Sequence, residues 1–282
     1  MNVDCTFLVN SNDKAEDLWK PFFTALKAQW PTMDLPIVLN TESKSFSFPG
    51  YDIKTLNLCK GKRKYPWGKM LIETLKRIDT KYVFCILDDY WLEAPVDEQE
   101  FLKVFKWMDE NPDIAAFCFY PGEMYAANIK DELFEGYELR PLVCGYRFGC
   151  GVAVWRKDRL MTFVRPHESA WEWEIWGTMR SPRYTDRIYV RKRNMPDVIP
   201  HGDPVKGGMV HRGKWIKEAV EKYSQIYDLS YIDFSKRGFE DFDEVNRVMN
   251  LTFKEKLKEP HLFRRALYRL TIFNIKRWLS LR

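Results

Sequence analysis

The chain has 282 residues, of which 45% are hydrophobic and 16% aromatic, and its formal net charge is +5. This length and composition can bury a large core, which predicts one large α/β domain with or without an appendage. The chain has 45 basic and 40 acidic residues, and nine of the basic and two of the acidic ones lie in 254–282. The remaining 36 basic and 38 acidic residues nearly cancel in charge. This balance excludes a general nucleic-acid surface on the rest of the chain.

The cysteines and the N-terminal residues indicate a compartment. None of the six cysteines forms a Cys-x-x-Cys pair, and Cys85 and Cys118 fall inside expected buried strands, so a reduced environment is expected. The opening MNVDCTFLVNSND lacks the basic and apolar regions of a signal peptide. No apolar run approaches the roughly 20 residues of a membrane span. We therefore expect a cytoplasmic protein.

The first elements follow a strand–helix–strand order. Residues 3–9 are predicted as a strand that ends at Asn10, in a cluster of residues that favour helix N-termini. A helix to about Gln29 and short strands over 36–40 and 51–58 are expected next. This order is typical of the first half of a nucleotide-binding α/β sheet, so Asn10 is a candidate nucleotide contact. Neither GxGxxG nor GxxxxGK[ST] occurs, so neither a Rossmann dinucleotide site nor a P-loop is predicted.

A basic loop and a helix come before the most informative strand. The loop over 60–64 reads KGKRK, and a helix is expected from Trp67 to about Ile78. Lys69, one turn into this helix, is a candidate contact to the phosphates or base of a ligand. The alternative is a solvated basic surface without a ligand.

The central stretch is YVFCILDDYWLEAP, residues 82–95. Its first six residues are apolar, which predicts a strand buried on both faces, as in a parallel sheet covered by helices. The strand ends at Asp88 and Asp89. Ligands of open α/β sheets bind outside the carboxyl ends of the strands. A divalent cation that carries a phosphate-bearing ligand would satisfy both acids, although Asp is also common in turns for local hydrogen bonds.

The elements expected after the acidic pair are a helix over 97–111, a strand over 114–120, an irregular region over 121–145 and a strand over 148–155. The stretch HESAWEWE follows and places Glu172 and Glu174 between Trp side chains. Aromatic shielding raises the pKa of a carboxyl, which suits a general base. Alternatively, Ser169 begins a helix whose dipole the two acids complement. Both interpretations stay open.

A late motif combines a glycine turn, one His and two cations. It reads GGMVHRGKW over 207–215, before a helix expected over about 214–227. At the start of a helix, His211, Arg212 and Lys214 would suit a metal-bound diphosphate. A single His is nevertheless more often structural than a ligand.

The combination of these parts resembles a GT-A-type nucleotide-sugar glycosyltransferase, notably the bacterial enzymes of surface-polysaccharide (capsule or O-antigen) assembly. The resembling pieces, within residues 1–230, are PWGKMLIETLKRIDTKYV, ILDDYW, AWEWE and MVHRGKW. The resemblance implies a GT-A-like (Rossmann-like) mixed, mostly parallel sheet flanked by helices, in a catalytic domain over 1–235. The chain departs from the common pattern by having Asp-Asp-Tyr in place of a spaced Asp-x-Asp.

The resemblance also implies roles for individual residues. Asp89 would bind Mn²⁺ or Mg²⁺ with a further contact from His211, and Asp88 would contact the ribose or sugar of the donor. Glu172 or Glu174 would deprotonate an acceptor hydroxyl. A hexosyl group would then pass, with inversion, from a nucleotide-diphosphate sugar such as a UDP-sugar to a saccharide acceptor. The irregular region over 121–147 and the Trp-rich segment would shape the acceptor pocket.

Two other functions stay open. A sugar-phosphate nucleotidyltransferase also needs metal-binding acids on an α/β sheet, but usually has a Gly-rich basic loop after its first strand, where this chain has LVNSNDKAED. A non-catalytic nucleotide- or carbohydrate-binding protein of the same fold would keep the pocket without the base.

Residues 236–282 are expected to form a basic helical appendage. On a helical wheel, the apolar residues of 254–282 share one broad face that Arg and Lys flank, the pattern of an interfacial helix. We therefore expect peripheral attachment to an anionic membrane surface, in keeping with an acceptor that is lipid-linked. The alternative is a helix that docks on the domain through the same apolar face.

Overall fold

The computed structural model describes residues 1–121, 133–202 and 208–241, together with positions 243, 247, 252, 255, 258, 275 and 278. An eight-stranded sheet, with strand order β3-β2-β1-β4-β7-β5-β8-β6, forms its centre. The strands are β1 (Cys5–Asn10), β2 (Ile37–Asn40), β3 (Ile53–Thr55), β4 (Tyr82–Leu87), β5 (Ile114–Pro121), β6 (Tyr137–Leu139), β7 (Ala153–Arg156) and β8 (Arg187–Arg191).

Most neighbouring strands are parallel. β1 runs parallel to β2 and β4, β2 to β3, and β5 to β8. β7 is inserted antiparallel between β4 and β5, and β6 is antiparallel to β8. The predicted mixed, mostly parallel sheet is therefore confirmed, and β4 has the bounds that its apolar run predicts.

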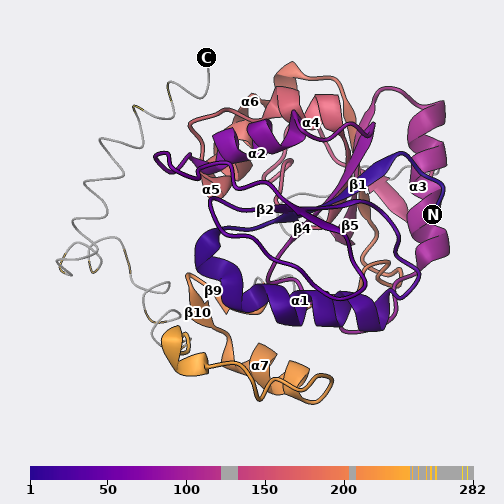
Figure 1. Ribbon diagram of the computed structural model, residues 1–282. Coiled ribbons are helices and arrows are strands. Elements are labelled where there is room, and N and C mark those ends of the chain that lie inside the picture. The colour runs from indigo at the N-terminus through magenta and orange to yellow at the C-terminus, as the bar shows by residue number, and fades with distance from the viewer. Residues whose placement is uncertain are drawn as a thin grey trace.

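Helices cover both faces of this sheet, as Figure 1 shows. The side chains of β1 alternate, so that Phe7 and Val9 face one core while Leu8 faces the other. The helices α1 (Glu16–Gln29) and α3 (Glu98–Glu110) pack on the first face. The second face is covered by α2 (Trp67–Leu75) and α4 (Lys157–Phe163). The predicted flanking by helices is confirmed as well.

Three expected elements are shorter or different. The strand expected over 51–58 is only β3, and the one expected over 148–155 begins at Ala153. Just before that strand, a Cβ at Gly151 would lie 2.5 Å from the Tyr120 ring, so this close approach requires glycine. The region expected to be irregular contains β6, while residues 122–132 lie outside the described residues.

The helix expected over 214–227 begins later, and a hairpin takes its place. The strands β9 (Val210–His211) and β10 (Lys214–Trp215) pair antiparallel across a two-residue turn. Both turn residues have positive φ, 51° at Arg212 and 85° at Gly213, as the hairpin turns with matching twist require. The helix itself, α7, spans Lys217–Ser224.

The segment after α7 packs back on the domain. The Trp215 N–H donates to the Gly238 carbonyl at 2.9 Å, and the Glu240 N–H donates to the Trp215 carbonyl at 2.8 Å. The expectation of a basic helical appendage falls almost entirely on positions outside the described residues. Within the described ranges, no helix is both long and apolar enough to cross a bilayer.

Candidate active site

The carboxyl ends of three neighbouring strands bring the acidic pair and two amides to one edge of the sheet. The parallel register pairs Asn10 of β1 with Asn40 of β2 on one side and with Leu87 of β4 on the other. Asp88 and Asp89 follow Leu87 directly. The acidic pair therefore lies where ligands of α/β sheets bind.

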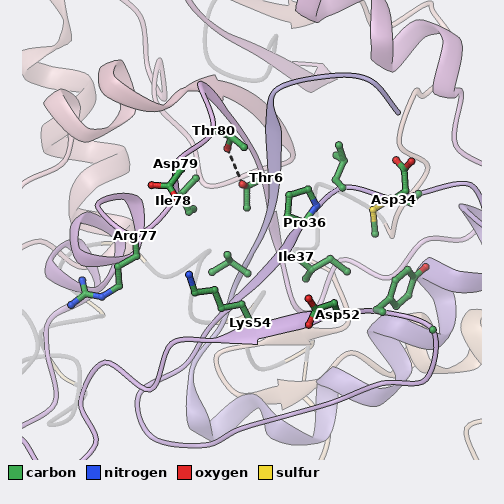
Figure 2. A pocket seen from close by; sticks show the side chains of 15 residues that line it. Thr6, Asp34, Pro36, Ile37, Asp52, Lys54, Arg77, Ile78, Asp79 and Thr80 are labelled. Carbon is green, nitrogen blue, oxygen red and sulfur yellow. Dashed lines mark hydrogen bonds between the residues drawn. The ribbon is translucent and has the colours of Figure 1, made fainter.

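A cleft of about 670 Å³ lies at the opposite edge of the sheet, where the strands begin (Figure 2). Its lining includes Thr6 at the start of β1, Pro36 just before β2, and Asp79 and Thr80 just before β4. These positions are at the amino ends of the strands, whereas the acidic pair follows the carboxyl end of β4. The cleft is thus separate from the candidate site.

Burial dominates the electrostatics of the acidic pair. Asp88 is buried and accepts a hydrogen bond from the Ser11 hydroxyl, whose oxygen accepts from the Trp19 indole N–H at 2.6 Å. Burial raises the pKa of the Asp88 carboxyl to about 7, against the lowering effects of Ser11 and Arg237. Burial and the neighbouring Asp88 charge also raise the pKa of Asp89 well above its usual range. The two acids therefore ionise together only at a cost that a bound cation would remove.

This raised pKa predicts an unusual dependence of stability on pH. Asp88 holds its proton more tightly in the folded than in the unfolded chain. The contribution of protonated Asp88 to the free energy of unfolding is therefore present in full below about pH 4, and it is lost as the pH rises through about 7. Without divalent cations, the Asp88→Asn variant should therefore exceed the wild type in free energy of unfolding by about 2–4 kcal/mol at pH 8. The two proteins should be nearly equal at pH 4.

Urea unfolding at both pH values measures the effect. The exposed Asp79→Asn variant controls for the loss of one negative charge and should track the wild type at both pH values. The prediction would be contradicted if the Asp88→Asn variant and the wild type differed in free energy of unfolding by the same amount at pH 4 and at pH 8.

The chain after residue 207 closes over Asp89. The Met209 N–H donates to the Asp89 carbonyl at 3.0 Å. Gly208 has φ of 76°, and a Cβ there would lie 2.7 Å from the Asp89 carbonyl oxygen and 2.9 Å from Oδ2, so this approach requires glycine. His211 lies further along and faces Glu240, with 3.6 Å between His211 Nδ1 and Glu240 Oε2.

The side chains fit a divalent cation only as part of a larger ligand set. Among the described residues, no three His, Cys, Asp or Glu side chains group closely enough to hold a metal ion. Mg²⁺ in proteins is nevertheless commonly bound by one or two carboxylates together with substrate phosphates and water. Asp88 and Asp89 can supply that number of carboxylates, so the site suits a cation that arrives with a diphosphate.

Two buried amides at the same edge have unsatisfied acceptors. Asn10 and Asn40 are both buried, and the Oδ1 atom of each has no hydrogen-bond partner in the described part of the chain. An unpaired buried acceptor costs about 1–3 kcal/mol, which a ligand N–H or O–H would recover. Asn40 was missed by the sequence analysis, although both strands end in the same way, as FLVN and IVLN.

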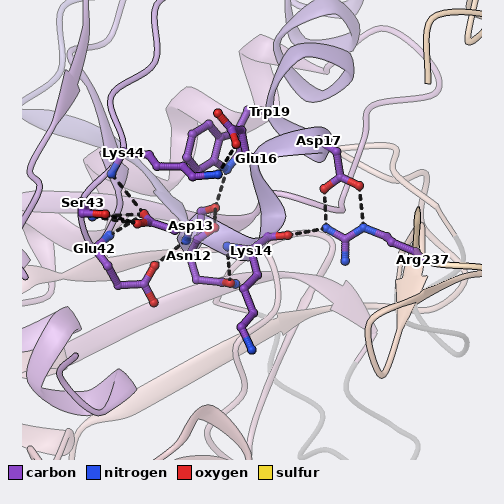
Figure 3. Close-up of polar contacts among 11 residues, drawn as sticks. Asn12, Asp13, Lys14, Glu16, Asp17, Trp19, Glu42, Ser43, Lys44 and Arg237 are labelled. Atoms are coloured by element: carbon purple, nitrogen blue, oxygen red, sulfur yellow. Dashed lines mark hydrogen bonds and ion pairs between the residues drawn. The ribbon is translucent and has the colours of Figure 1, made fainter. Parts of the chain in front are cut away.

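The loops that follow β1 and β2 are fixed to each other, as Figure 3 shows. The Asp13 carboxylate accepts main-chain N–H groups from Glu42 at 3.0 Å, Ser43 at 3.0 Å and Lys44 at 3.3 Å. Although burial acts to raise it, these hydrogen bonds and the Ser43 hydroxyl hold the pKa of Asp13 below its usual range. Glu42 in turn pairs with Lys64 of the basic loop. The rim of the site is thereby held in one arrangement.

Arg237 is a cation whose charge acts on both acids. Its guanidinium forms a two-pronged ion pair with Asp17 and donates to the Lys14 carbonyl at 2.8 Å (Figure 3). Its charge lowers the pKa of Asp88 and of Asp89. The contact joins residues 220 positions apart, so no local signal in the sequence could have identified it.

The three predicted cations do not contact the acidic pair. Lys69 places its ammonium 3.9 Å from the centre of the Tyr65 ring. Arg212 and Lys214 are both exposed, at and beside the turn of the β9–β10 hairpin. No hydrogen bond or ion pair among the described residues joins any of them to the acidic pair.

The structure separates the roles of the two candidate bases. Glu172 completes a capping box on the short helix α5 (Ala170–Glu172): its carboxylate accepts from the Ser169 N–H at 2.8 Å, and its own N–H donates to the Ser169 hydroxyl at 3.3 Å. A π-helical turn, Trp173–Gly177, follows directly and contains Glu174. Such turns are frequent at functional sites. Glu172 therefore caps the start of the helix, which leaves Glu174 as the stronger candidate for the base.

Glu174 is held in place and shielded. Its Oε1 accepts from the Cys150 N–H at 2.9 Å. Burial raises the pKa of the Glu174 carboxyl, against the lowering effect of Cys150. Of the two neighbouring Trp side chains, Trp173 is buried and stacks on Phe148, whereas Trp171 is exposed. A carboxylate with a raised pKa suits proton abstraction near neutral pH.

A fully buried ion pair positions this helical segment. The Arg180 guanidinium donates to both carboxylate oxygens of Glu168 and to the Phe163 carbonyl at 2.6 Å. Removing one partner of such a pair leaves a buried charge, which typically costs 3–5 kcal/mol. We expect Arg180→Met to lower the free energy of unfolding by about this amount, measured by denaturant titration.

Two further variants decide whether the buried charge is the cause. The double variant Glu168→Leu with Arg180→Met should recover most of the loss, because it removes both charges. Arg187→Met breaks the more exposed pair with Asp113 and should cost about 1 kcal/mol or less. Equal losses in the Arg180 and Arg187 variants would contradict the prediction.

No protein-family model matches this chain, and no curated protein does. Solved structures similar to it include Staphylococcus aureus TarS in complex with UDP, with a TM-score of 0.44 and 10% identity over 90% of this chain and 77% of that one. CMP:2-keto-3-deoxy-manno-octonic acid synthetase complexed with CTP has a TM-score of 0.40 and 10% identity, over 70% and 93%. A third structure is a provisionally assigned nucleotide-diphospho-sugar transferase from Desulfovibrio desulfuricans. It has a TM-score of 0.38 and 12% identity over 70% of this chain and 83% of that one.

The chain spans 59% and 46% of the length of two further TarS structures. With TM-scores of 0.38 to 0.45, these similarities assign no activity to this chain. The function has to be inferred from the site itself.

Proposed function

We propose that this chain is a glycosyltransferase that moves a sugar from a nucleotide-diphosphate sugar, a UDP-sugar, to a saccharide hydroxyl with inversion. The observation that carries this proposal is that the charges of two carboxylates, one from the acidic pair and one from the helical segment, both act on Tyr90. Burial raises the pKa of the Tyr90 hydroxyl, and the charges of Asp89 and Glu174 raise it further. Asp89 and Glu174 therefore both act electrostatically on this one side chain, which supports a shared site.

In this proposal, the acidic pair and Glu174 have different roles in the reaction. Asp89, with Asp88 beside it, would hold Mn²⁺ or Mg²⁺, which when bound supplies Lewis-acid stabilisation of the diphosphate leaving group. Glu174 would take the proton of the acceptor hydroxyl as the new bond forms at the anomeric carbon and the bond to the diphosphate breaks. A shielded carboxylate with a raised pKa supports this assignment.

The amides and cations of the site would bind the donor. The unsatisfied acceptors of Asn10 and Asn40 are suited to N–H or O–H groups of the nucleoside. Contacts of Lys69, Arg212, Lys214 and His211 to the donor or its metal stay predictions. So do a place in surface-polysaccharide assembly and attachment to an anionic membrane through residues 254–282.

Thermal stabilisation and turnover together test the proposal. UDP with Mn²⁺ should raise the melting temperature by several degrees at about 100 times its Kd, since binding at that excess contributes about 2.7 kcal/mol. UDP-sugars should be hydrolysed slowly when no acceptor is present. Stabilisation by a nucleoside triphosphate, with release of pyrophosphate from a sugar phosphate, would instead establish a nucleotidyltransferase. Stabilisation by nucleotides without any turnover would leave a binding protein.

A further inference from the structure

A cavity of about 470 Å³ opens beside Glu174. Two segments form it, residues 143–146 and the helical residues 174–182. Of the residues that line it, Glu174 alone carries a charge, and four of the other eight are apolar and non-aromatic: Val143, Ile175, Met179 and Pro182. This volume lies within the range of small-molecule sites, which is roughly 300–1,000 Å³.

The walls of this cavity are fixed before any ligand binds. Buried Arg140 donates from Nη2 to the Gly145 carbonyl at 3.0 Å and to the Tyr146 carbonyl at 2.8 Å, which holds the first segment. Two residues after the first segment, the Phe148 N–H donates to the Thr178 hydroxyl at 3.0 Å, which ties this part of the chain to the helical segment. The cavity is therefore part of the folded structure.

Its apolar side chains are unusually exposed. Val143 is 79% exposed, Met179 45%, Ile175 39% and Tyr146 38%. Single exposed apolar residues are normal on protein surfaces. Here, however, four of the twelve large exposed apolar residues in the described chain line one cavity. Their gathering at one cavity, rather than scattered over the surface, favours a binding site.

The chemistry of the lining distinguishes between possible acceptors. Flat sugar rings are bound by stacking on aromatic rings, yet Tyr146 is the one aromatic residue in the lining. Hydroxyl groups pressed against Val143, Ile175 and Met179 would lose water without gaining partners. An aliphatic chain, by contrast, gains about fourfold in affinity for each methylene that is fully buried.

We propose that this cavity binds the aliphatic chain of an amphiphilic acceptor, a lipid-linked saccharide, whose hydroxyl lies at Glu174. This inference rests on the proposed function for the role of Glu174. The predicted occupant is thus a molecule with a polar sugar at the base and an alkyl or isoprenoid chain along the aliphatic wall.

Octyl β-glucoside and methyl β-glucoside, which share one sugar, are the probes for the full-length chain. Below its micelle concentration, the octyl compound should bind at least 10-fold more tightly than the methyl compound in calorimetric titration. Cys144 lines the cavity and reports occupancy without any need for activity. Its alkylation by iodoacetamide, followed by mass spectrometry, should slow in the octyl compound and not in the methyl compound.

The chain offers a matched pair of variants, because Ile175 and Ile226 are 39% and 40% exposed and only Ile175 lines the cavity. Ile175→Ser should reduce the preference for the octyl compound at least threefold. Ile226→Ser should leave the preference unchanged. Thermal melting of both variants verifies that each is folded.

The possible outcomes separate this inference from the proposed function. Equal binding of the two glucosides, together with stabilisation by UDP and Mn²⁺, would overturn the inference alone. A preference for the octyl compound without any nucleotide binding would keep the apolar site and overturn the proposed function. A dimer in sedimentation that the Ile175→Ser change dissociates would overturn the inference by making a second copy of the chain the occupant.

Discussion

Asp89→Asn should lower sugar transfer by about 10³-fold or more and abolish stabilisation by UDP with Mn²⁺. The lost carboxylate charge removes a ligand of the cation, and the charge stabilisation that such a cation supplies to a leaving group amounts to several kcal/mol. The fold should persist, because β4 is apolar up to Leu87 and the Met209 N–H donates to the Asp89 main chain rather than to its side chain.

Initial rates with a UDP-sugar and thermal melting with and without UDP measure this effect. Asp52→Asn removes an equivalent charge from an exposed position just before β3 and serves as the control. It should retain full transfer and full stabilisation. An Asp89→Asn protein with unchanged turnover would remove the acidic pair from the mechanism altogether.

Elements with strong periodic signals were predictable from the sequence. β4 is buried between two neighbours and two helical layers, so its apolar run is continuous and its bounds are clear. The helix α3 begins at the Asp97 cap and ends at Glu110, close to the expected range over 97–111. In both elements, local pattern and tertiary burial favour the same structure.

Elements that depend on distant partners were not predictable. β6 has three residues and is held at the edge of the sheet by β8 alone, so its sequence has no strand periodicity to detect. In the β9–β10 hairpin, Gly213 is a usual residue for positive φ, but Arg212 is not, and the motif therefore looked like a helix start. Each of these structures follows from pairing, which a single sequence does not display.

The acidic residues of the site were predictable from the sequence, whereas the residues that surround them were not. The position of Asp88 and Asp89 follows from the strand before them. A choice between Glu172 and Glu174 was also within reach, because Ser-Ala-Trp-Glu has the spacing of a capping box and assigns Glu172 to the helix start. Arg237, by contrast, reaches the site through a contact across most of the chain.

Glu174→Gln is expected to lower transfer at least about 10²-fold, the usual contribution of a general base. The amide oxygen of Gln can still accept from the Cys150 N–H, so the geometry of the π-helical turn should persist while proton abstraction is lost. Glu172→Gln is the matched control, from the helix that directly precedes the π-helical turn. It should keep its transfer activity, because its carboxylate serves the Ser169 cap and Gln fulfils the same role.

The pH profile adds a readout that a purely structural role would not move. Because burial raises the pKa of Glu174, the base is protonated, and transfer declines, at a higher pH than for an ordinary Glu. The acid limb of kcat against pH should therefore lie above the usual Glu range in the wild type and in Glu172→Gln. It should be absent from the residual transfer of Glu174→Gln, while stabilisation by UDP persists. Full transfer in both variants would place the base elsewhere or indicate a retaining mechanism, and a loss confined to Glu172→Gln would reverse the two assignments.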